Sequence, residues 1–390
     1  MAGVTLVMAL AGTPAAALTP LQSALESDLA AYLKERGAVE HISAASASVS
    51  LAKGAPVINA VAGATTFGGR EPVTPANLFQ IGSNTKAFTA VMLLQLEAEH
   101  RLSLADTVGH WLPEYPAWKG VTITQLLNMT SGIVSYDTVP AMLADYARDP
   151  QRTFTEKELV AYAYPPDGAP VVSRGWSYSN TAYILGQMII ERATGHSYDA
   201  ELHQRLLSPR LGLADTFYAP SFYPPSVTSR MVSGYFYSRD PDNAPLAPLY
   251  GRDAKPFSLS WTQGAGGIVA SLEDVAHWVR QLYSGPVLAP AQRHELLSIV
   301  SNGTGRPIAA TSASDSKGFG LGVGQVAMPT VGSVWYYEGE TLGYRVIYGY
   351  FPNEDTVIAV GLNSQPNAAD DHIGQLMTSL HATLHAAGKL

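Results

Sequence analysis

The chain has 390 residues, 46% of them hydrophobic and 14% charged, which is the composition of a soluble globular protein with a large buried core. Its net charge of −8 and its lack of basic runs argue against nucleic acid as a partner. It has no cysteine, which excludes disulfides, thiolate nucleophiles and thiolate metal sites but does not fix the compartment.

Residues 1–17 are small and apolar and end in Ala15-Ala16-Ala17, which resembles a signal-peptidase site. The basic residues that usually begin a signal peptide are missing, so a truncated signal peptide is the preferred interpretation and a disordered or helical extension is the alternative. The preferred interpretation predicts a periplasmic or secreted protein. No other run approaches the length needed to span a membrane.

The first part of the chain predicts a helix and then a hairpin. Residues 20–34 have an amphipathic pattern typical of a helix. Small and apolar residues alternate over 42–52 and, after a turn, 56–63 follow as a second strand, which predicts a β-hairpin. The apolar run 87–96 predicts a mostly buried helix that begins near Ser83.

Helical patterns dominate the middle of the chain. Another helix is predicted from Thr122, with Thr122 or Thr124 as a plausible cap, and further helices over 182–193, 198–207 and 272–283. Residues 219–261 are rich in Pro, Tyr and Ser and show little periodicity. They predict a long irregular region of the kind that often lines binding clefts.

The last third predicts strands over 320–326, 334–338, 343–350 and 356–362, and a closing helix over 373–386. The expected outline therefore has strands and helices at both ends of the chain and a mainly helical insert between them. No internal repeat is visible.

Ser83 and Lys86 lie one turn apart on the same face at the start of the predicted helix. Backbone N–H groups and the dipole at a helix N-terminus favour a developing negative charge. Burial of an unpaired lysine lowers its pKa until it can accept a proton from a serine hydroxyl. The simpler alternative is that Ser83 caps the helix and Lys86 is solvated.

Tyr178 and Asn180 precede the predicted helix over 182–193 and are candidates for the remaining polar groups of such a site. A nearby lysine ammonium would lower the pKa of the Tyr178 phenol and make phenolate accessible as a base. The Asn180 amide could hold both Lys86 and a substrate amide. An ordinary surface aromatic is the alternative for Tyr178, because the chain has 20 tyrosines.

Residues 337–344 end one predicted strand and begin the next. Glycines in this segment permit close approach of the backbone, so that an N–H at the strand edge could stabilise an oxyanion. Taken alone, the segment is better interpreted as a simple hairpin.

Five motifs occur in a defined order: Gly82-Ser83-Asn84-Thr85-Lys86, Leu126-Leu127-Asn128-Met129-Thr130-Ser131-Gly132, Tyr178-Ser179-Asn180, Gly264-Ala265-Gly266-Gly267, and Gly339 with Gly343-Tyr344. In this order and spacing, residues 25 to 385 resemble the serine β-lactamase-like and penicillin-binding-protein-like family. The most similar subgroup holds class C β-lactamases, D-alanyl-D-alanine carboxypeptidases, D-aminopeptidases and related esterases.

The resemblance implies an α+β fold of two lobes, in which an antiparallel sheet flanked by the terminal helices packs on an all-helical lobe. The catalytic domain would span 20–390, with the α/β lobe at about 20–82 and 265–390 and the helical lobe at about 83–264. The active site would lie in the groove between the lobes.

The family's site residues transfer to this chain by motif matching. They are Ser83 as the acylated nucleophile, Lys86 as its partner base, Tyr178 as second base and acid, Asn180 as a substrate-positioning group, and the backbone N–H groups of Ser83 and Glu340 as the oxyanion hole. The third motif, Tyr337-Glu338-Gly339, would contribute to substrate binding.

That third motif departs from the family pattern, in which Lys-Thr-Gly, or His in place of Lys, is usual. A carboxylate at Glu338 would repel the carboxylate of a β-lactam or of a terminal D-alanine, by several kcal/mol in a dry site. This disfavours β-lactamase or D-alanyl-D-alanine carboxypeptidase activity, which is kept as the alternative.

The predicted activity is that of a serine hydrolase acting through an acyl-enzyme on an ester or amide. Glu338 facing an ammonium group would indicate a D-aminopeptidase or amidase for amine-bearing substrates, and Glu338 pointing away would indicate an esterase. A catalytically silent member used for binding or scaffolding is the alternative from another class, against which the intact Ser83, Lys86, Tyr178 and Asn180 argue.

The expected partner is a small molecule or a short peptide or ester substrate. No cofactor and no metal site are expected, because the histidines, such as His100, His110 and His277, are scattered and no His-Glu-x-x-His spacing occurs.

Overall fold

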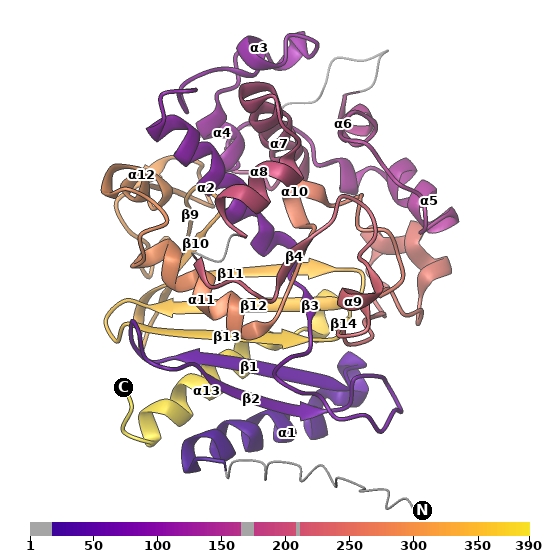
Figure 1. Cartoon of the computed structure of the whole chain (residues 1–390), viewed down its shortest axis with the longest axis vertical. Helices are drawn as coiled ribbons and strands as arrows, with labels where there is room; N and C mark the ends of the chain where they lie inside the picture. The colour runs from indigo at the N-terminus through magenta and orange to yellow at the C-terminus, as the bar shows by residue number, and fades with distance from the viewer. Residues whose placement is uncertain (1–17, 165–174, 208–210) are drawn as a thin grey trace, which may run out of the picture.

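The computed structural model describes residues 18–164, 175–207 and 211–390, and it is organised around an antiparallel sheet (Figure 1). The strand order in this sheet is β2-β1-β13-β12-β11-β10-β9-β7-β8. The strands are β1 (Ala44–Ser50), β2 (Ile58–Gly63), β7 (Ile299–Ser301), β8 (Pro307–Ile308), β9 (Lys317–Phe319), β10 (Gly324–Met328), β11 (Gly332–Thr341), β12 (Tyr344–Phe351) and β13 (Thr356–Leu362). The expected hairpin of the amino-terminal region is therefore confirmed, and it joins the carboxy-terminal strands through β1 and β13.

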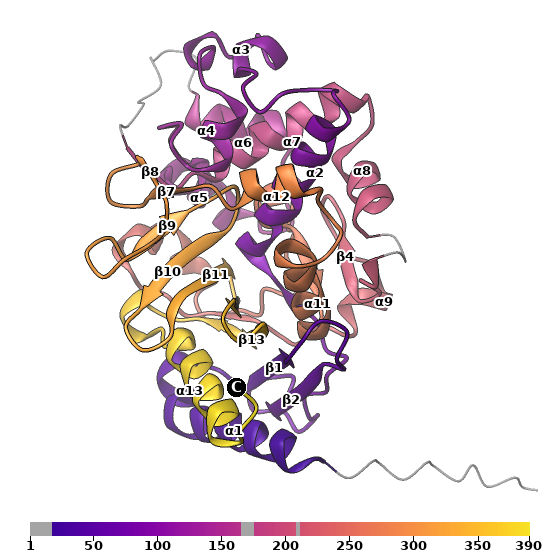
Figure 2. The same cartoon turned by 90° about the vertical axis from the view of Figure 1, so that its left-hand side faces the viewer.

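The inner strands of this sheet are covered on both faces. Every residue of β1 and of β13 is buried, and their sequences are short or branched apolar side chains with interspersed serines. Figure 2 shows α1 (Pro20–Glu40) and α13 (Ile373–Ala386) side by side on one face and α11 (Leu272–Tyr283) on the other. This double cover explains why the strand pattern is nearly continuous rather than alternating.

The helical part of the molecule lies above the sheet in Figure 1 and is built around two buried helices. They are α2 (Thr85–Ala98) and α7 (Asn180–Thr194). Around them lie α3 (Val108–Trp111), α4 (Ile123–Leu127), α5 (Pro140–Arg148), α6 (Glu156–Ala163), α8 (Tyr198–Arg205), α10 (Gln263–Gly266) and α12 (Pro290–Leu296). Because α2 is apolar on almost all sides, a polar side chain on it is enclosed by protein.

Two smaller sheets complete the fold, one of them next to α2. They are β3 (Phe79–Gln80), β6 (Ile268–Ala270) and β4 (Thr216–Tyr218), and the parallel pair β5 (Tyr235–Phe236) and β14 (Ser364–Gln365). In the first sheet β6 pairs with both β3 and β4, and β3 leads directly toward Ser83. The segment before the predicted nucleophile is thereby tied to the Gly-rich motif that precedes β6.

Several sequence expectations match at the level of single residues. The closing helix spans 373–386 as predicted, and of the two candidate caps, Thr122 and Thr124, it is Thr122 that caps α4, in a capping box with Gln125. Residues 219–261 contain only the short elements β5, α9 (Pro225–Thr228) and a 3₁₀ segment Pro241–Leu249, because prolines interrupt any longer helix.

The α+β fold with an antiparallel sheet and terminal helices is confirmed. The predicted signal-peptide remnant, 1–17, lies outside the described residues. Within the part of the chain that is described, no helix has the length and hydropathy required to cross a bilayer.

Candidate active site

Ser83 lies in a 3₁₀ turn, Gly82–Asn84, that continues directly into α2. Gly82 has φ +50, a left-handed conformation that glycine adopts without strain. A Cβ atom on Gly82 would lie 2.6 Å from both the backbone nitrogen and the carbonyl oxygen of Glu340. Glycine is therefore required for the turn to pass close to β11.

Lys86 is completely buried on the first turn of α2, and its ammonium nitrogen has three oxygen partners. Nζ lies 2.9 Å from Ser83 Oγ, 2.6 Å from Asn180 Oδ1 and 2.7 Å from the carbonyl oxygen of Ala265. Burial lowers the pKa of Lys86 to about 7, and the nearby Asp137 carboxylate acts in the opposite direction. The lowered pKa agrees with the sequence prediction.

The hydroxyl of Tyr178 lies 2.6 Å from Ser83 Oγ, so Ser83 is in contact with both candidate proton-transfer groups. Burial raises the pKa of the Tyr178 phenol well above its usual value, and the hydrogen bond with Ser83 lowers it only in part. This direction is opposite to the lowered pKa that the sequence analysis expected. The expected cation, Lys86, is itself easily deprotonated, and the loss of hydration dominates.

Asn180 begins α7, and its side chain links Lys86 to Asp137. Its Nδ2 donates to Asp137 Oδ2 at 2.7 Å, while its Oδ1 accepts from Lys86. The backbone nitrogen of Asn180 donates to Ser135 Oγ at 2.8 Å, and Ser135 in turn donates to Asp137. The sequence analysis missed Asp137, although it follows closely on the predicted motif ending in Gly132.

The third motif lies on β11, directly beside the turn that carries Ser83. A Cβ atom on Gly339 would lie 2.0 Å from the carbonyl oxygen of Ile81 and 2.7 Å from the backbone nitrogen of Ser83. The two segments predicted to supply the oxyanion hole, at Ser83 and Glu340, are thus in backbone contact. Gly339 serves this approach and is not among the cavity-lining residues.

A cavity of about 480 Å³ opens beside Ser83. Six predicted site residues line it: Ser83, Tyr178, Asn180, Tyr337, Glu338 and Glu340. Its wall also carries the carboxylates of Asp137 and Asp371, and among the described residues that line it there is no lysine, arginine or histidine. The cavity is therefore acidic.

Three of these carboxylates form a cluster, with oxygen atoms of Glu338, Glu340 and Asp371 within 4.8 Å of one another. Burial and the neighbouring carboxylates raise the pKa of Glu338 well above its usual value and that of Glu340 to about 7. Arg345, which is fully buried, forms ion pairs with Asp371 and with Glu40. Within the described chain, Glu338 Oε1 has no hydrogen-bond partner.

Comparison with known proteins gives a consistent result. Residues 29–380 match the family described as Beta-lactamase. The chain is 26% identical over 292 residues to "Penicillin-binding protein 4*" of Bacillus subtilis (strain 168), an alignment that covers 74% of this chain and 61% of that protein. The chain thus spans less than two thirds of the length of this relative.

Two solved structures are similar over most of their length. A D-stereospecific amidohydrolase from Streptomyces sp. is 27% identical with a TM-score of 0.72, covering 88% of this chain and 94% of that one. The D-amino acid amidase from Ochrobactrum anthropi SV3 complexed with L-phenylalanine has a TM-score of 0.78 at 23% identity, covering 94% and 99%. The second likeness shows the fold alone.

Proposed function

The chain belongs to the β-lactamase family of serine hydrolases, and from this premise we propose that it hydrolyses amides or esters of D-amino acids that carry a free amino group. The observation that carries the substrate class is the acidic cavity beside Ser83, which has carboxylates on its wall and no cationic side chain among its described lining residues. Such a cavity attracts an ammonium group and repels a substrate carboxylate.

Acylation begins in this proposal at Ser83. Neutral Lys86, which a pKa of about 7 makes abundant at neutral pH, accepts the hydroxyl proton as Ser83 Oγ attacks the substrate carbonyl. The backbone N–H groups of Ser83 and Glu340 stabilise the oxyanion. The bond between carbonyl carbon and leaving group then breaks as the leaving group takes a proton from Tyr178. In the second half of the reaction, water attacks the acyl carbonyl and gives a proton to the Tyr178 phenolate, the bond to Ser83 Oγ breaks, and Lys86 returns its proton to that oxygen.

Tyr178 supplies the proton that the leaving group needs. Its hydroxyl is 2.6 Å from Ser83 Oγ, and its raised pKa keeps it a neutral phenol, which is a proton donor. A departing amine requires this proton, whereas an activated phenolate leaving group does not. Tyr178 therefore acts as the acid, and Lys86 is the base.

The proposed ammonium site is the cluster of Glu338, Glu340 and Asp371. In the free protein burial and then the neighbouring carboxylates raise the pKa of Glu338, and an ammonium group would offset the repulsion between these carboxylates and favour their ionised forms. Glu338 Oε1 is buried and has no hydrogen-bond partner among the described residues, so it is available to accept a hydrogen bond from a substrate ammonium group. The similarity to a D-stereospecific amidohydrolase supports the D configuration.

The test compares three substrates: a D-amino acid amide with a free amine, its N-acetyl derivative, and a short p-nitrophenyl ester without an amine. We expect kcat/KM for the free amine to exceed that for the N-acetyl compound by at least about tenfold, which corresponds to about 1.4 kcal/mol. Glu338→Gln should raise KM for the free amine and leave the N-acetyl compound unaffected. Equal kinetics on the amine and its acetylated form would contradict the substrate class while leaving the Ser83 chemistry intact.

A further inference from the structure

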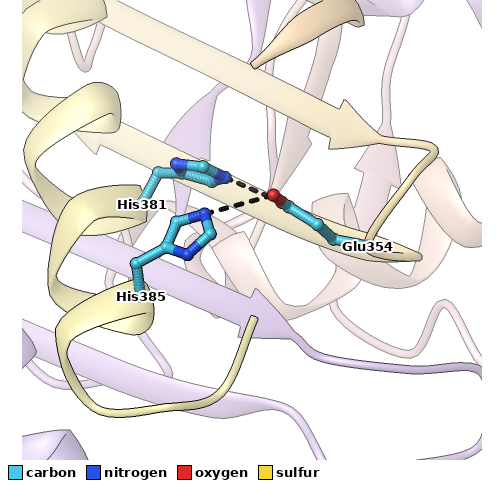
Figure 3. Close-up of side chains that lie close together, drawn as sticks. All are labelled: Glu354, His381 and His385. Carbon is cyan, nitrogen blue, oxygen red and sulfur yellow. Dashed lines mark hydrogen bonds and ion pairs between the residues drawn. The ribbon is translucent and has the colours of Figure 1, made fainter. Parts of the chain in front are cut away.

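Two histidines of α13 and one glutamate converge at the end of the sheet, away from the acidic cavity. Figure 3 shows His381 and His385, one helical turn apart, both directed at Glu354 in the turn between β12 and β13. The Nε2 atom of His381 lies 2.7 Å from Glu354 Oε2, and Nε2 of His385 lies 3.2 Å from Oε1. One ligand atom from each residue lies within 4.8 Å of the other two.

We propose that His381, His385 and Glu354 bind a divalent transition-metal ion of the zinc type. Imidazole nitrogen and carboxylate oxygen are the donors that zinc takes in proteins without cysteine, and two histidines at i and i+4 present their rings from one helix face. Zinc bonds of about 2.0–2.1 Å in tetrahedral geometry place ligand atoms roughly 3.3 Å apart. The observed separations of 2.7 and 3.2 Å are slightly shorter than that spacing, and the three ligand atoms lie within 4.8 Å of one another, so small side-chain movements would admit an ion.

The site is held by packing from two parts of the chain. His381 is 7% exposed and stacks on Phe351 at the end of β12, with ring centroids 4.3 Å apart. Beside Glu354, Asp355 is paired with Arg280 of α11, which fixes the turn. His385 is 51% exposed, so a water molecule can reach the fourth position of a bound ion.

The location gives the ion a structural role. It would join the last helix to the β12–β13 turn, two segments that the chain otherwise connects through β13, β14 and the loop that leads into α13. The ion would thereby restrain the carboxy-terminal end of α13. Asp371, on the wall of the acidic cavity, lies just before α13, ten residues from His381 in sequence. At 1.5 Å per residue this is roughly 15 Å along the helix, too far for direct contact with substrate.

The experiment uses the full chain without an affinity tag, stripped with a chelator and then titrated with Zn²⁺ against a chromophoric competitor. We expect one equivalent to bind, Co²⁺ to give the visible absorption of a four-coordinate nitrogen and oxygen site, and Zn²⁺ to raise the midpoint of thermal unfolding. His385→Ala and Glu354→Gln should each weaken binding by about a hundredfold or more and abolish the unfolding shift.

The matched control is His203→Ala. His203 is also 51% exposed, lies on a helix and is 2.9 Å from the Asp199 carboxylate. Among the described residues, however, no second histidine joins this pair to form a possible metal site. Removal of the His203 side chain should leave zinc binding unchanged. The proposal fails if the unaltered chain binds Zn²⁺ no more tightly than His385→Ala, or if His203→Ala causes an equal loss, because the three side chains would then be only a hydrogen-bonded ion-pair cluster.

Discussion

The Asp137 carboxylate lies 2.7 Å from the Asn180 amide nitrogen, and the oxygen of the same amide accepts a hydrogen bond from Lys86, so Asn180 links Asp137 to Lys86. This contact fixes the orientation of the amide, since its nitrogen must face Asp137 and its oxygen must face the ammonium. It also places a negative charge near the buried lysine, which partly offsets the effect of burial on its pKa.

Asp137→Asn is expected to move the acidic limb of the rate profile to lower pH. Burial lowers the pKa of Lys86 and Asp137 raises it, so removing the charge lowers it further. Because the neutral amine is the active base, kcat/KM of the unaltered chain rises as pH increases through about 7, and in the variant it rises at a pH lower by up to about one unit. Profiles recorded between pH 5 and 9 test this, with the exposed Asp149→Asn as control; an unmoved limb would show that Asp137 does not influence the base.

Ser83→Ala should abolish turnover and leave the fold intact. The lost hydroxyl is the proposed nucleophile, whereas at a helix start it contributes only about 1 kcal/mol to stability. Mass spectrometry after incubation with a fluorophosphonate probe checks the first point and thermal unfolding the second. Labelling that persists in the variant would place the nucleophile elsewhere, and no labelling of the unaltered chain would favour a silent binding protein.

Tyr178→Phe should slow acylation according to the leaving group. For an amide, whose nitrogen must be protonated as it departs, we expect a loss of about a hundredfold or more. For a p-nitrophenyl ester of the same acyl group, the loss should be markedly smaller. Parallel single-turnover measurements on the two substrates decide the matter, and an equal loss on both would mean that Tyr178 acts as a base or positions Ser83 rather than protonating the leaving group.

Comparison of Lys86→Met with the unaltered chain should show how much the burial of this lysine lowers the free energy of unfolding. The folded pKa of about 7 is below the ordinary value of 10.5, so the unfolded chain binds more protons between these values and stability from this group rises with pH. Its cost is full below about pH 7 and disappears above about pH 10, with roughly 4–5 kcal/mol as an upper limit. Denaturant unfolding at pH 7 and pH 9.5 should therefore show that the free energy of unfolding of the unaltered chain increases, relative to that of the variant, at the higher pH. A constant difference would contradict the lowered pKa.

Sequence patterns were sufficient for the parts of the site that belong to local motifs. Ser83 and Lys86 are one helical turn apart, and Tyr178 and Asn180 stand at the start of the next buried helix, so motif order predicted the set that the fold brings together. The β-strand that carries Glu340 was also predicted, although it extends to Thr341, beyond the expected end at 338.

The features of the site that could not be predicted from the sequence depend on contacts and burial that arise only in the tertiary structure. Asp371 is adjacent to Glu338 in space only because Arg345 and Glu40, from opposite ends of the chain, hold that region together. The direction of the Tyr178 pKa shift was wrong because it follows from the loss of water around the phenol, which no local pattern encodes. The cluster of Glu354 with His381 and His385 escaped notice because the carboxylate comes from a turn 27 residues before the first histidine.

The close packing of Gly339 limits which positions on β11 can be substituted during evolution. The Gly339 backbone lies against that of Ile81 and Ser83, so no side chain can be accommodated there, whereas the neighbouring Glu338 and Glu340 are among the residues that line the cavity. Under the proposed function, the backbone amide that would stabilise the oxyanion is thus anchored by one residue, and the carboxylates proposed to select the substrate are carried by the residues on either side. Mutation can therefore exchange the selectivity of the pocket, from anionic to cationic compounds, without displacing the acyl-transfer machinery.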